Sequence, residues 1–465
     1  MLNRSPRPAG ALATLAAALA LGACQQDPAP RPPVVVIGVD GMEWSVVEPL
    51  LREGSMPNLA RLIEHGVAGS LASMKPTFSP MLWTTIVTGR MPQDHGIPFF
   101  SEVDPASGMP KEGGLPYTSE CRRVPALWNL ADAAGLSTTA VAWWISWPAE
   151  HLQRGRVVSS YAAQAQGALM WKAGVWADGL PELTWPVELA KELAPRLRAG
   201  SPTGPVVQEQ RARYGTFPTD SIASERQRAL TDVRQRNFLA SWTSDRVHAR
   251  IFCDLLEREV SDLNLVYFGA TDVVGHMFWK YHEPSAYEFQ IPADQVEFFG
   301  QHVRKACQDV DVWLGEILAR LPEERVVVLV SDHGMRAFYK NDPLSLQNGH
   351  HQEGEAGVFV LSGTGVMQRG LLGAEQRLLG DLRDVAPLVS DLLGIAALRE
   401  MQPNSLRGLM DAAWQTAHPE AARVPSPPFR APMPPREPVA NASAIFTEQF
   451  SQLGYSGVGG SEPPR

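Results

Sequence analysis

At 465 residues, 44% of them hydrophobic, the chain can bury a large core as one α/β domain with insertions or as two domains. Its net charge of −9 argues against nucleic-acid binding through the overall field, so we expect no nucleic-acid partner. Three of its four cysteines lie beyond the N-terminal region, and their spacing is not that of a metal site.

The N-terminus has the pattern of an export signal. Residues 1–23 combine a basic start with an apolar stretch that is too short to span a bilayer. Residues 21–24, LGAC, resemble the lipobox of bacterial lipoproteins, which implies cleavage before Cys24 and lipidation of its thiol. A proline-rich tether, 24–33, would follow. We therefore expect a protein of the bacterial cell envelope that is lipid-anchored to the outer membrane and faces the periplasm; the alternative is a plain secretory signal with a chance cysteine.

Strands that alternate with helices are predicted over residues 34–424. Five apolar runs are typical of buried strands: 34–39, 138–144, 263–268, 325–330 and 357–362. Helical patterns lie between them, for example at 56–66 and 294–320. This alternation predicts an α/β fold with a mainly parallel central sheet and helices on both faces.

Two regions depart from the alternation. Residues from about 160 to 245 are polar and rich in proline and glycine, which predicts an insertion or cap. Residues 425–465 begin with a proline-rich stretch and are expected to form a C-terminal arm.

Candidate metal ligands follow three of the predicted strands. They are Asp40, then Asp272 with His276, then Asp332 with His333. A fourth segment, just before the last predicted strand, contains His350 and His351. In open parallel sheets the strand ends and following loops form the reactive edge, so we expect these side chains to converge. Any one of them alone could be a helix cap or a structural histidine.

The residue types indicate zinc chemistry. Asp272 and His276 are four residues apart, so their side chains point the same way on a helix. Sets of aspartate and histidine suit zinc, with an open position for substrate. Six such ligands would hold two metal ions, an arrangement that stabilises the attacking and leaving oxygens of phosphoryl transfer.

Residues 75–89, KPTFSPMLWTTIVTG, contain a candidate nucleophile. Pro80 suits the first position of a helix and Ser79 its cap, where free backbone N–H groups attract an anion. Ser79 could thus be an ordinary cap, or a nucleophile that attacks phosphorus while those N–H groups hold the phosphoryl oxygens. The two roles are compatible, and the nearby ligand clusters favour the nucleophile.

These motifs together resemble the alkaline phosphatase superfamily, and most closely its type I phosphodiesterase/nucleotide pyrophosphatase branch. The resemblance runs from about residue 34 to about residue 400. It is carried by GVDGMEW, SPMLWTTIVTG followed by HGI, ATDVVGH, SDHGM and a Gly-x-His at 349–351. In the family pattern the nucleophile lies ten residues before the glycine of the Thr-Gly pair, which implies Ser79, with Thr77 as the second choice.

The resemblance also implies how the ligands divide. Asp40, Asp332 and His333 would bind one metal alongside Ser79, and the second metal would be bound by Asp272, His276 and His351. His351 is the third residue of the Gly-x-His, and His350 is its alternative. His95, in HGI, is interpreted as structural.

The expected function is hydrolysis of phosphate esters, of diester or pyrophosphate bonds, through a phospho-serine intermediate. The substrate would be a small-molecule, lipid-linked or glycan-linked phosphate ester. Leu82 stands where family phosphodiesterases often have asparagine, which would make one wall apolar and favour a diester over a monoester. The alternatives are a phosphomonoesterase, an envelope head-group phosphotransferase, a sulfatase and a tethered binding module. A sulfatase is disfavoured because its Ser-x-Pro-x-Arg motif matches only residues 426–430, in the proline-rich arm.

Overall fold

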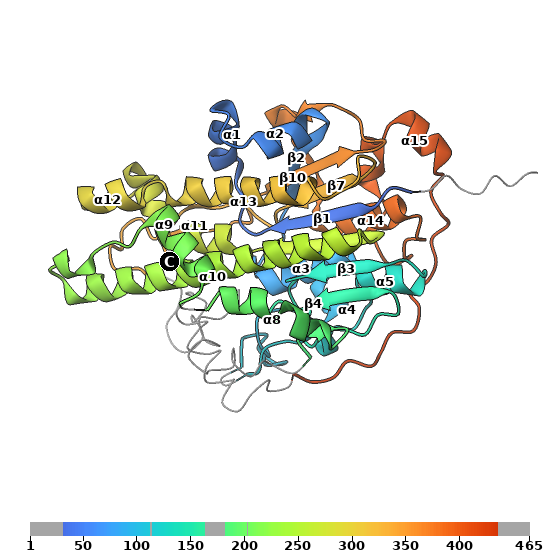
Figure 1. Cartoon of the computed structure of the whole chain (residues 1–465), viewed down its shortest axis with the longest axis horizontal. Helices are drawn as coiled ribbons and strands as arrows, with labels where there is room; N and C mark the ends of the chain where they lie inside the picture. The colour runs from blue at the N-terminus through green and yellow to red at the C-terminus, as the bar shows by residue number, and fades with distance from the viewer. Residues whose placement is uncertain (1–30, 112–113, 163–181, 202, 436–465) are drawn as a thin grey trace, which may run out of the picture. The chain divides into compact units, whose positions relative to one another are not determined.

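The computed structural model describes residues 31–111, 114–162, 182–201 and 203–435. The predicted signal peptide, most of the tether, the middle of the predicted insertion and the end of the C-terminal arm lie outside these residues. The described chain is built around a ten-stranded sheet, in the order β11-β2-β10-β7-β1-β6-β3-β4-β5 with β12 paired to β2 (Figure 1). A separate two-stranded ribbon pairs β8 with β9.

The strands have the following bounds: β1 Val34–Val39, β2 Gly66–Ala72, β3 Thr138–Val141, β4 Gly155–Val158, β5 Thr184–Trp185, β6 Leu263–Phe268, β7 Val326–Val330, β8 Arg336–Ala337, β9 Gly349–His350, β10 Gly357–Gly363, β11 Gly370–Leu371 and β12 Leu378–Asp381. The five central strands β7, β1, β6, β3 and β4 are parallel. β10 runs antiparallel to its neighbours β7 and β2, and β5 antiparallel to β4. The mainly parallel sheet predicted from the sequence is confirmed.

The α-helices are α1 Trp44–Arg52, α2 Pro57–Glu64, α3 Ser79–Thr88, α4 Pro92–His95, α5 Leu127–Ala133, α8 Leu189–Ala199, α9 Pro205–Tyr214, α10 Glu225–Arg258, α11 Ala270–His282, α12 Ala293–Phe299, α13 His302–Leu318, α14 Val385–Leu393 and α15 Ala412–Ala417. α13 packs against α1, α2, α10 and α11, whereas α14 packs with α3 and α5. These two groups cover the faces of the sheet, as Figure 1 shows. Among the described residues, no helix combines the length and the apolar character that a bilayer crossing requires.

Two predicted strands, 34–39 and 263–268, have the predicted bounds because they are buried along their whole length. The helix predicted at 294–320 is wrong in one respect: it is two helices, α12 and α13, with a break at Gly300. A side chain at Gly300 would bring its Cβ within 2.5 Å of the Val296 carbonyl oxygen. The helical periodicity continues across the break, so hydrophobicity alone does not reveal it.

The described part of the predicted insertion, 160–245, contains β5, α8, α9 and the first part of α10. α10 continues to Arg258 and packs against β6 and β3. It therefore lies over the sheet beside the strand that leads to α11.

Candidate active site

The ends of three neighbouring strands place the carboxylates. β7, β1 and β6 are adjacent, parallel and in register, so all three end at the same edge of the sheet. Asp40 directly follows β1, Asp332 comes two residues after β7, and Asp272 lies in the first turn of α11 after β6. All three are buried. The convergence expected from the sequence is therefore present.

The histidines reach the same edge by a different route. Because β10 runs antiparallel to β7, its beginning lies beside the end of β7. The β8–β9 ribbon precedes β10 and delivers His350 and His351 to this edge. His276 comes from α11, one turn after Asp272, and His333 follows Asp332 directly.

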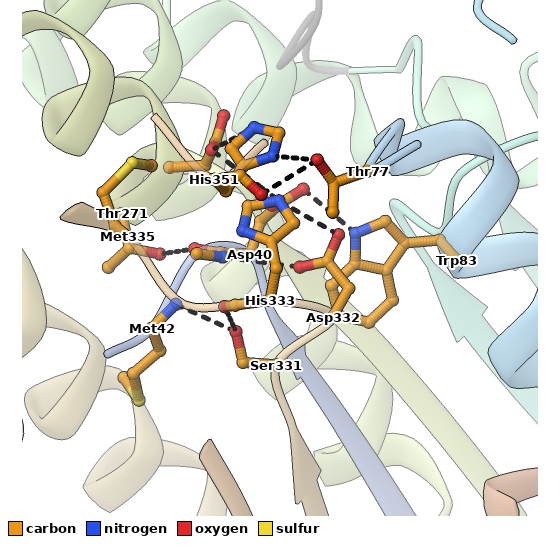
Figure 2. A network of polar contacts seen from close by, with 12 residues as sticks. Asp40, Met42, Thr77, Trp83, Thr271, Ser331, Asp332, His333, Met335 and His351 are labelled. Carbon is orange, nitrogen blue, oxygen red and sulfur yellow. Dashed lines mark hydrogen bonds and ion pairs between the residues drawn. The ribbon is translucent and has the colours of Figure 1, made fainter. Parts of the chain in front are cut away.

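The first predicted set, Asp40, Asp332 and His333, is brought together (Figure 2). The His333 Nε2 lies 3.3 Å from an Asp40 oxygen and 3.4 Å from an Asp332 oxygen. All three side chains are at most 2% exposed.

The second predicted set, Asp272, His276 and His351, is also brought together. The His276 Nε2 lies 3.2 Å from Asp272 Oδ1 and 3.1 Å from His351 Nε2. His351 Nε2 is 3.8 Å from the same Asp272 oxygen. His333 joins the two sets, since its Nε2 is 4.0 Å from Asp272 Oδ1 and its ring stacks on that of His351.

The donor set fits divalent metal ions. Four of its buried atoms have no hydrogen-bond partner in the described chain: Asp40 Oδ1, Asp272 Oδ1, Asp332 Oδ2 and His333 Nε2. Burying such atoms unpaired is costly, and a cation would offset that cost. Ligand atoms about 2.0–2.2 Å from a tetrahedral zinc lie about 3.3–3.6 Å apart, close to the spacings of 3.2–3.4 Å between aspartate and histidine atoms seen here.

The buried carboxylates give the site an excess of negative charge. Burial and the neighbouring Asp40 charge raise the pKa of Asp332 well above its usual range. Burial alone would lower the pKa of His333, but the charges of Asp332 and Asp40 outweigh it and raise that pKa to about 10. A bound cation would take the place of these protons.

Hydrogen bonds orient the three predicted histidine ligands alike. Nδ1 of His276 lies 2.8 Å from the Gly349 carbonyl oxygen, and Nδ1 of His333 lies 3.0 Å from that of Gly334. Nδ1 of His351 lies 2.7 Å from the Thr77 hydroxyl, which itself donates to the His351 carbonyl oxygen. Each Nδ1 therefore carries the hydrogen, so in the neutral ring the lone pair that can bind a metal is on Nε2.

His350 has the opposite arrangement. Its Nδ1 accepts hydrogen bonds from the backbone N–H groups of His351 and Gln352, at 2.9 and 3.0 Å. In the neutral ring the hydrogen must then be on Nε2, where it prevents metal binding. Burial lowers the pKa of His350 to about 2, so the ring is neutral at ordinary pH. The hydrogen bonds therefore favour His351 over His350 as the ligand.

Asp40 is held by two residues that the sequence analysis missed. The indole Nε1 of Trp83 donates to Asp40 Oδ2 at 3.0 Å (Figure 2). The Tyr267 hydroxyl donates to the same oxygen at 2.6 Å. These bonds leave Oδ1 turned to the cluster. The residue types of 83 and 267 carry no signal of this role, because it depends on strands and helices that are distant in sequence.

Ser79 begins α3 and is buried. The predicted cap is displaced by one residue: Phe78 is the N-cap, Ser79 the first helical residue and Pro80 the second, and no side chain caps the helix. Ser79 and Trp83 are four residues apart, so they share the face of α3 that meets Asp40. This places Ser79 on the side of the helix that faces the ligands.

Three other sequence interpretations can be compared with the structure. Leu82 is fully buried in the hydrophobic core and is not among the residues of the large cleft that Phe78 and Met81 line, so it does not form an apolar wall there. His95 is structural, as interpreted: its Nδ1 accepts from the Ile97 amide and its Nε2 lies 3.1 Å from the Thr85 hydroxyl. The sulfatase-like match lies on the exposed arm, where the Ser426 hydroxyl bonds Glu400.

Asp245, on α10, was not anticipated. Its Oδ2 accepts hydrogen bonds from the backbone N–H groups of Gly269 and Ala270, at 2.9 and 2.7 Å. It therefore caps α11, the helix that carries Asp272 and His276, from a neighbouring helix. No local motif marks it.

Comparison with known proteins agrees with this geometry. The model of the family described as type I phosphodiesterase / nucleotide pyrophosphatase matches residues 34–385. The chain belongs to this family. It is therefore a metal-dependent hydrolase of the phosphodiesterase/pyrophosphatase kind that acts on phosphoester bonds. No curated protein matches the chain in sequence.

Solved structures resemble the chain at low identity, with TM-scores below 0.5. The human ectonucleotide pyrophosphatase/phosphodiesterase 5 is 13% identical, with a TM-score of 0.47 over 82% of this chain and 100% of that one. The murine protein, 12% identical over the same shares with a TM-score of 0.47, was solved as an inactive variant with AMP. The phosphonoacetate hydrolase of Sinorhizobium meliloti, with phosphonoformate, is 17% identical, with a TM-score of 0.39 over 66% of this chain and 57% of that one.

Proposed function

We propose that this family member hydrolyses phosphodiester or pyrophosphate bonds with two divalent metal ions, zinc by donor type, through a phosphorylated Ser79. The observation that carries the proposal is the buried cluster of carboxylate and imidazole groups at one sheet edge, several of whose atoms have no hydrogen-bond partner among the described residues. Trp83 of α3 contacts this cluster through Asp40. A binding module without chemistry would have no need of such a cluster.

The two predicted sets assign the ligands. One ion is assigned to Asp40, Asp332 and His333, and the other to Asp272, His276 and His351. When bound, such ions supply Lewis acidity: they lower the pKa of a serine hydroxyl and neutralise charge on the phosphoryl oxygens.

The chain supplies the nucleophile and part of the oxyanion stabilisation. Ser79 Oγ attacks phosphorus and the first alcohol leaves, taking up the proton that the serine loses. Water then breaks the bond between Ser79 and phosphorus, which releases the phosphate monoester and restores the hydroxyl. The helix does not use the backbone N–H groups of Ser79 and Met81, so they are free to bind a phosphoryl oxygen; Pro80, between them, has none.

The charges near Ser79 favour a diester. A monoester carries nearly two negative charges and calls for a further cation near the phosphoryl oxygens. Lys75 pairs with Glu353 at the surface. Arg90 follows the far end of α3, about 15 Å along the helix from Ser79, and pairs with Asp94. Neither side chain is placed to supply that cation.

The test is a comparison of three nitrophenyl esters at fixed zinc. We expect the phosphodiester to have a higher kcat/KM than the phosphate monoester, and the sulfate monoester to be the poorest. Rapid quenching followed by mass spectrometry should find a phosphoryl adduct on Ser79. A monoester that clearly exceeds the diester, or an adduct on another residue, would contradict the proposal.

We also propose that Cys24 carries the lipid anchor predicted from the LGAC pattern. A Cys24→Ala variant of the full chain should then move from the membrane fraction to the soluble envelope fraction. Retention of the variant in the outer membrane would contradict a lipid anchor at this residue.

A further inference from the structure

A large cleft adjoins the metal-ligand cluster. Its volume is about 1020 Å³, and Thr77 and His350 are among the residues that line it. The Thr77 hydroxyl lies 2.7 Å from His351 Nδ1, so the wall of the cleft contacts a predicted metal ligand. Phe78, the N-cap of α3, and Met81, in the first turn of that helix, line it as well. Any group attached to a phosphorus atom at Ser79 would be next to this cleft.

The cleft is lined mainly by apolar side chains. Of its 18 lining residues 11 are apolar, and they include four methionines and two phenylalanines: Met74, Met81, Met91, Met109, Phe78 and Phe99. The two phenylalanine rings pack edge to face with centroids 4.6 Å apart, which makes a rigid wall. Methionine side chains are flexible and polarisable, so they adapt to ligands of varied shape.

Charge is nearly absent from the lining. The only ionised side chains among the described lining residues are Lys75 and Glu353, which pair with each other at 3.3 Å and are 60% and 57% exposed. Among the described lining residues, the cleft therefore offers no unpaired cation for a second phosphate or another strongly negative substituent. A flexible hydrocarbon would bury apolar surface against the methionines.

We propose that this cleft binds a hydrocarbon chain attached to the phosphoester, so that the substrates are amphiphilic phosphodiesters rather than nucleotide esters. The inference rests on the proposed function, because it places the scissile phosphorus at Ser79. It goes further by assigning the substituent, which the metal-ligand cluster does not determine.

The test is a series of alkyl 4-nitrophenyl phosphates from methyl to octyl, each used below its micelle concentration. If each added methylene is partly buried, kcat/KM should rise about twofold per methylene, or about a hundredfold from methyl to octyl. Calorimetry with the corresponding uncleaved alkyl phosphonates should give a heat-capacity change that becomes more negative as the chain lengthens. A flat series, or the nitrophenyl ester of thymidine monophosphate exceeding the octyl ester, would overturn the proposal.

Two methionine variants locate the effect. Met109, in the cleft, and Met433, on the C-terminal arm and not among the lining residues, are both 53% exposed. Met109→Glu should lower the octyl-to-methyl ratio of kcat/KM at least about tenfold, since it puts a charge against the alkyl chain. Met433→Glu should keep the wild-type ratio. Equal octyl-to-methyl ratios in the two variants would show that the alkyl chain binds elsewhere, and would refute the assignment.

The same series separates this inference from the function on which it rests. If the methyl ester is hydrolysed and the ratio does not rise with chain length, only the hydrocarbon assignment fails. If no ester is hydrolysed by protein that retains its metals, the phosphodiesterase proposal fails.

Discussion

Replacing the adjacent histidines His350 and His351 one at a time should separate metal binding from stability. His351→Ala removes a side chain whose Nε2 lies 3.1 Å from His276 Nε2 and 3.8 Å from Asp272 Oδ1. His350→Ala removes a side chain whose Nδ1 accepts two backbone N–H groups. The two losses should therefore appear in different measurements.

The expected magnitudes follow from those contacts. Removal of an orienting outer-shell group typically lowers metal affinity 10–100-fold. Loss of the proposed ligand His351 should therefore lower the affinity for one of the two ions by at least about 100-fold. In the His350 variant, the buried His351 N–H loses its partner, whereas the exposed Gln352 N–H can turn to water. One unpaired buried donor costs about 1–3 kcal/mol. For a domain of this length, that free energy lowers Tm by about 1–3 °C.

The assay is metal content per chain after dialysis, together with thermal unfolding of the same samples. His351→Ala should retain one of two ions, and His350→Ala should retain both with a lower Tm. His350→Asn, whose side-chain oxygen can accept a hydrogen bond, should recover part of the loss in Tm. One retained ion in His350→Ala, with two in His351→Ala, would move the ligand to His350.

Three further predictions concern the nucleophile, a helix cap and a buried histidine. Ser79→Ala should lower kcat by about a thousandfold or more while both metals stay bound. Thr77→Ala should instead lower the affinity for one metal ion about 10–100-fold. The reverse pattern would make Thr77 the nucleophile. Asp245→Ala should lower the free energy of unfolding by about 1–3 kcal/mol, because α11 loses its cap. Asp245→Asn should lower it by less. Urea melts that show no difference from wild type would exclude the capping role. Burial lowers the pKa of His302 to about 3, so this ring stays neutral in the folded chain while the unfolded chain takes up a proton as pH falls below about 6.5. That difference lowers the free energy of unfolding by about 2 kcal/mol at pH 5. His302→Phe should therefore lose less of its free energy of unfolding between pH 7 and pH 5 than wild type does. Parallel profiles of unfolding free energy against pH would refute the reasoning.

The fold was predictable where burial is uniform. The runs 34–39 and 263–268 are strands with the predicted bounds because both of their faces are covered, which removes polar positions from the pattern. β2, Gly66–Ala72, was not predicted, since its glycines and serine have low strand propensity. Gly66 is required there by close pairing: a Cβ would lie 2.2 Å from the Leu361 carbonyl oxygen of β10.

The positions of the carboxylates were predictable from strand ends, but their partners were not. Asp40, Asp272 and Asp332 each follow a strand, and neighbouring parallel strands necessarily end together. The bonds from Trp83 and Tyr267 to Asp40 join α3, β1 and β6, and depend on the exact rotation of each element. Sequence spacing holds no information about that rotation.

The protonation of His350 and His351 depends on contacts that the sequence does not reveal. The Gly-x-His spacing favours His351 over His350 by resemblance alone, and both are buried imidazoles at the same edge. What separates them is which ring nitrogen bears the hydrogen, and that is determined by whether Nδ1 faces an acceptor or a donor. For His351 the Thr77 hydroxyl donates to the His351 carbonyl oxygen and so must accept from Nδ1; for His350 two backbone N–H groups occupy Nδ1. Thr77, the second choice of nucleophile by sequence, thus has its hydroxyl engaged with the proposed ligand His351. This engagement favours Ser79 as the proposed nucleophile.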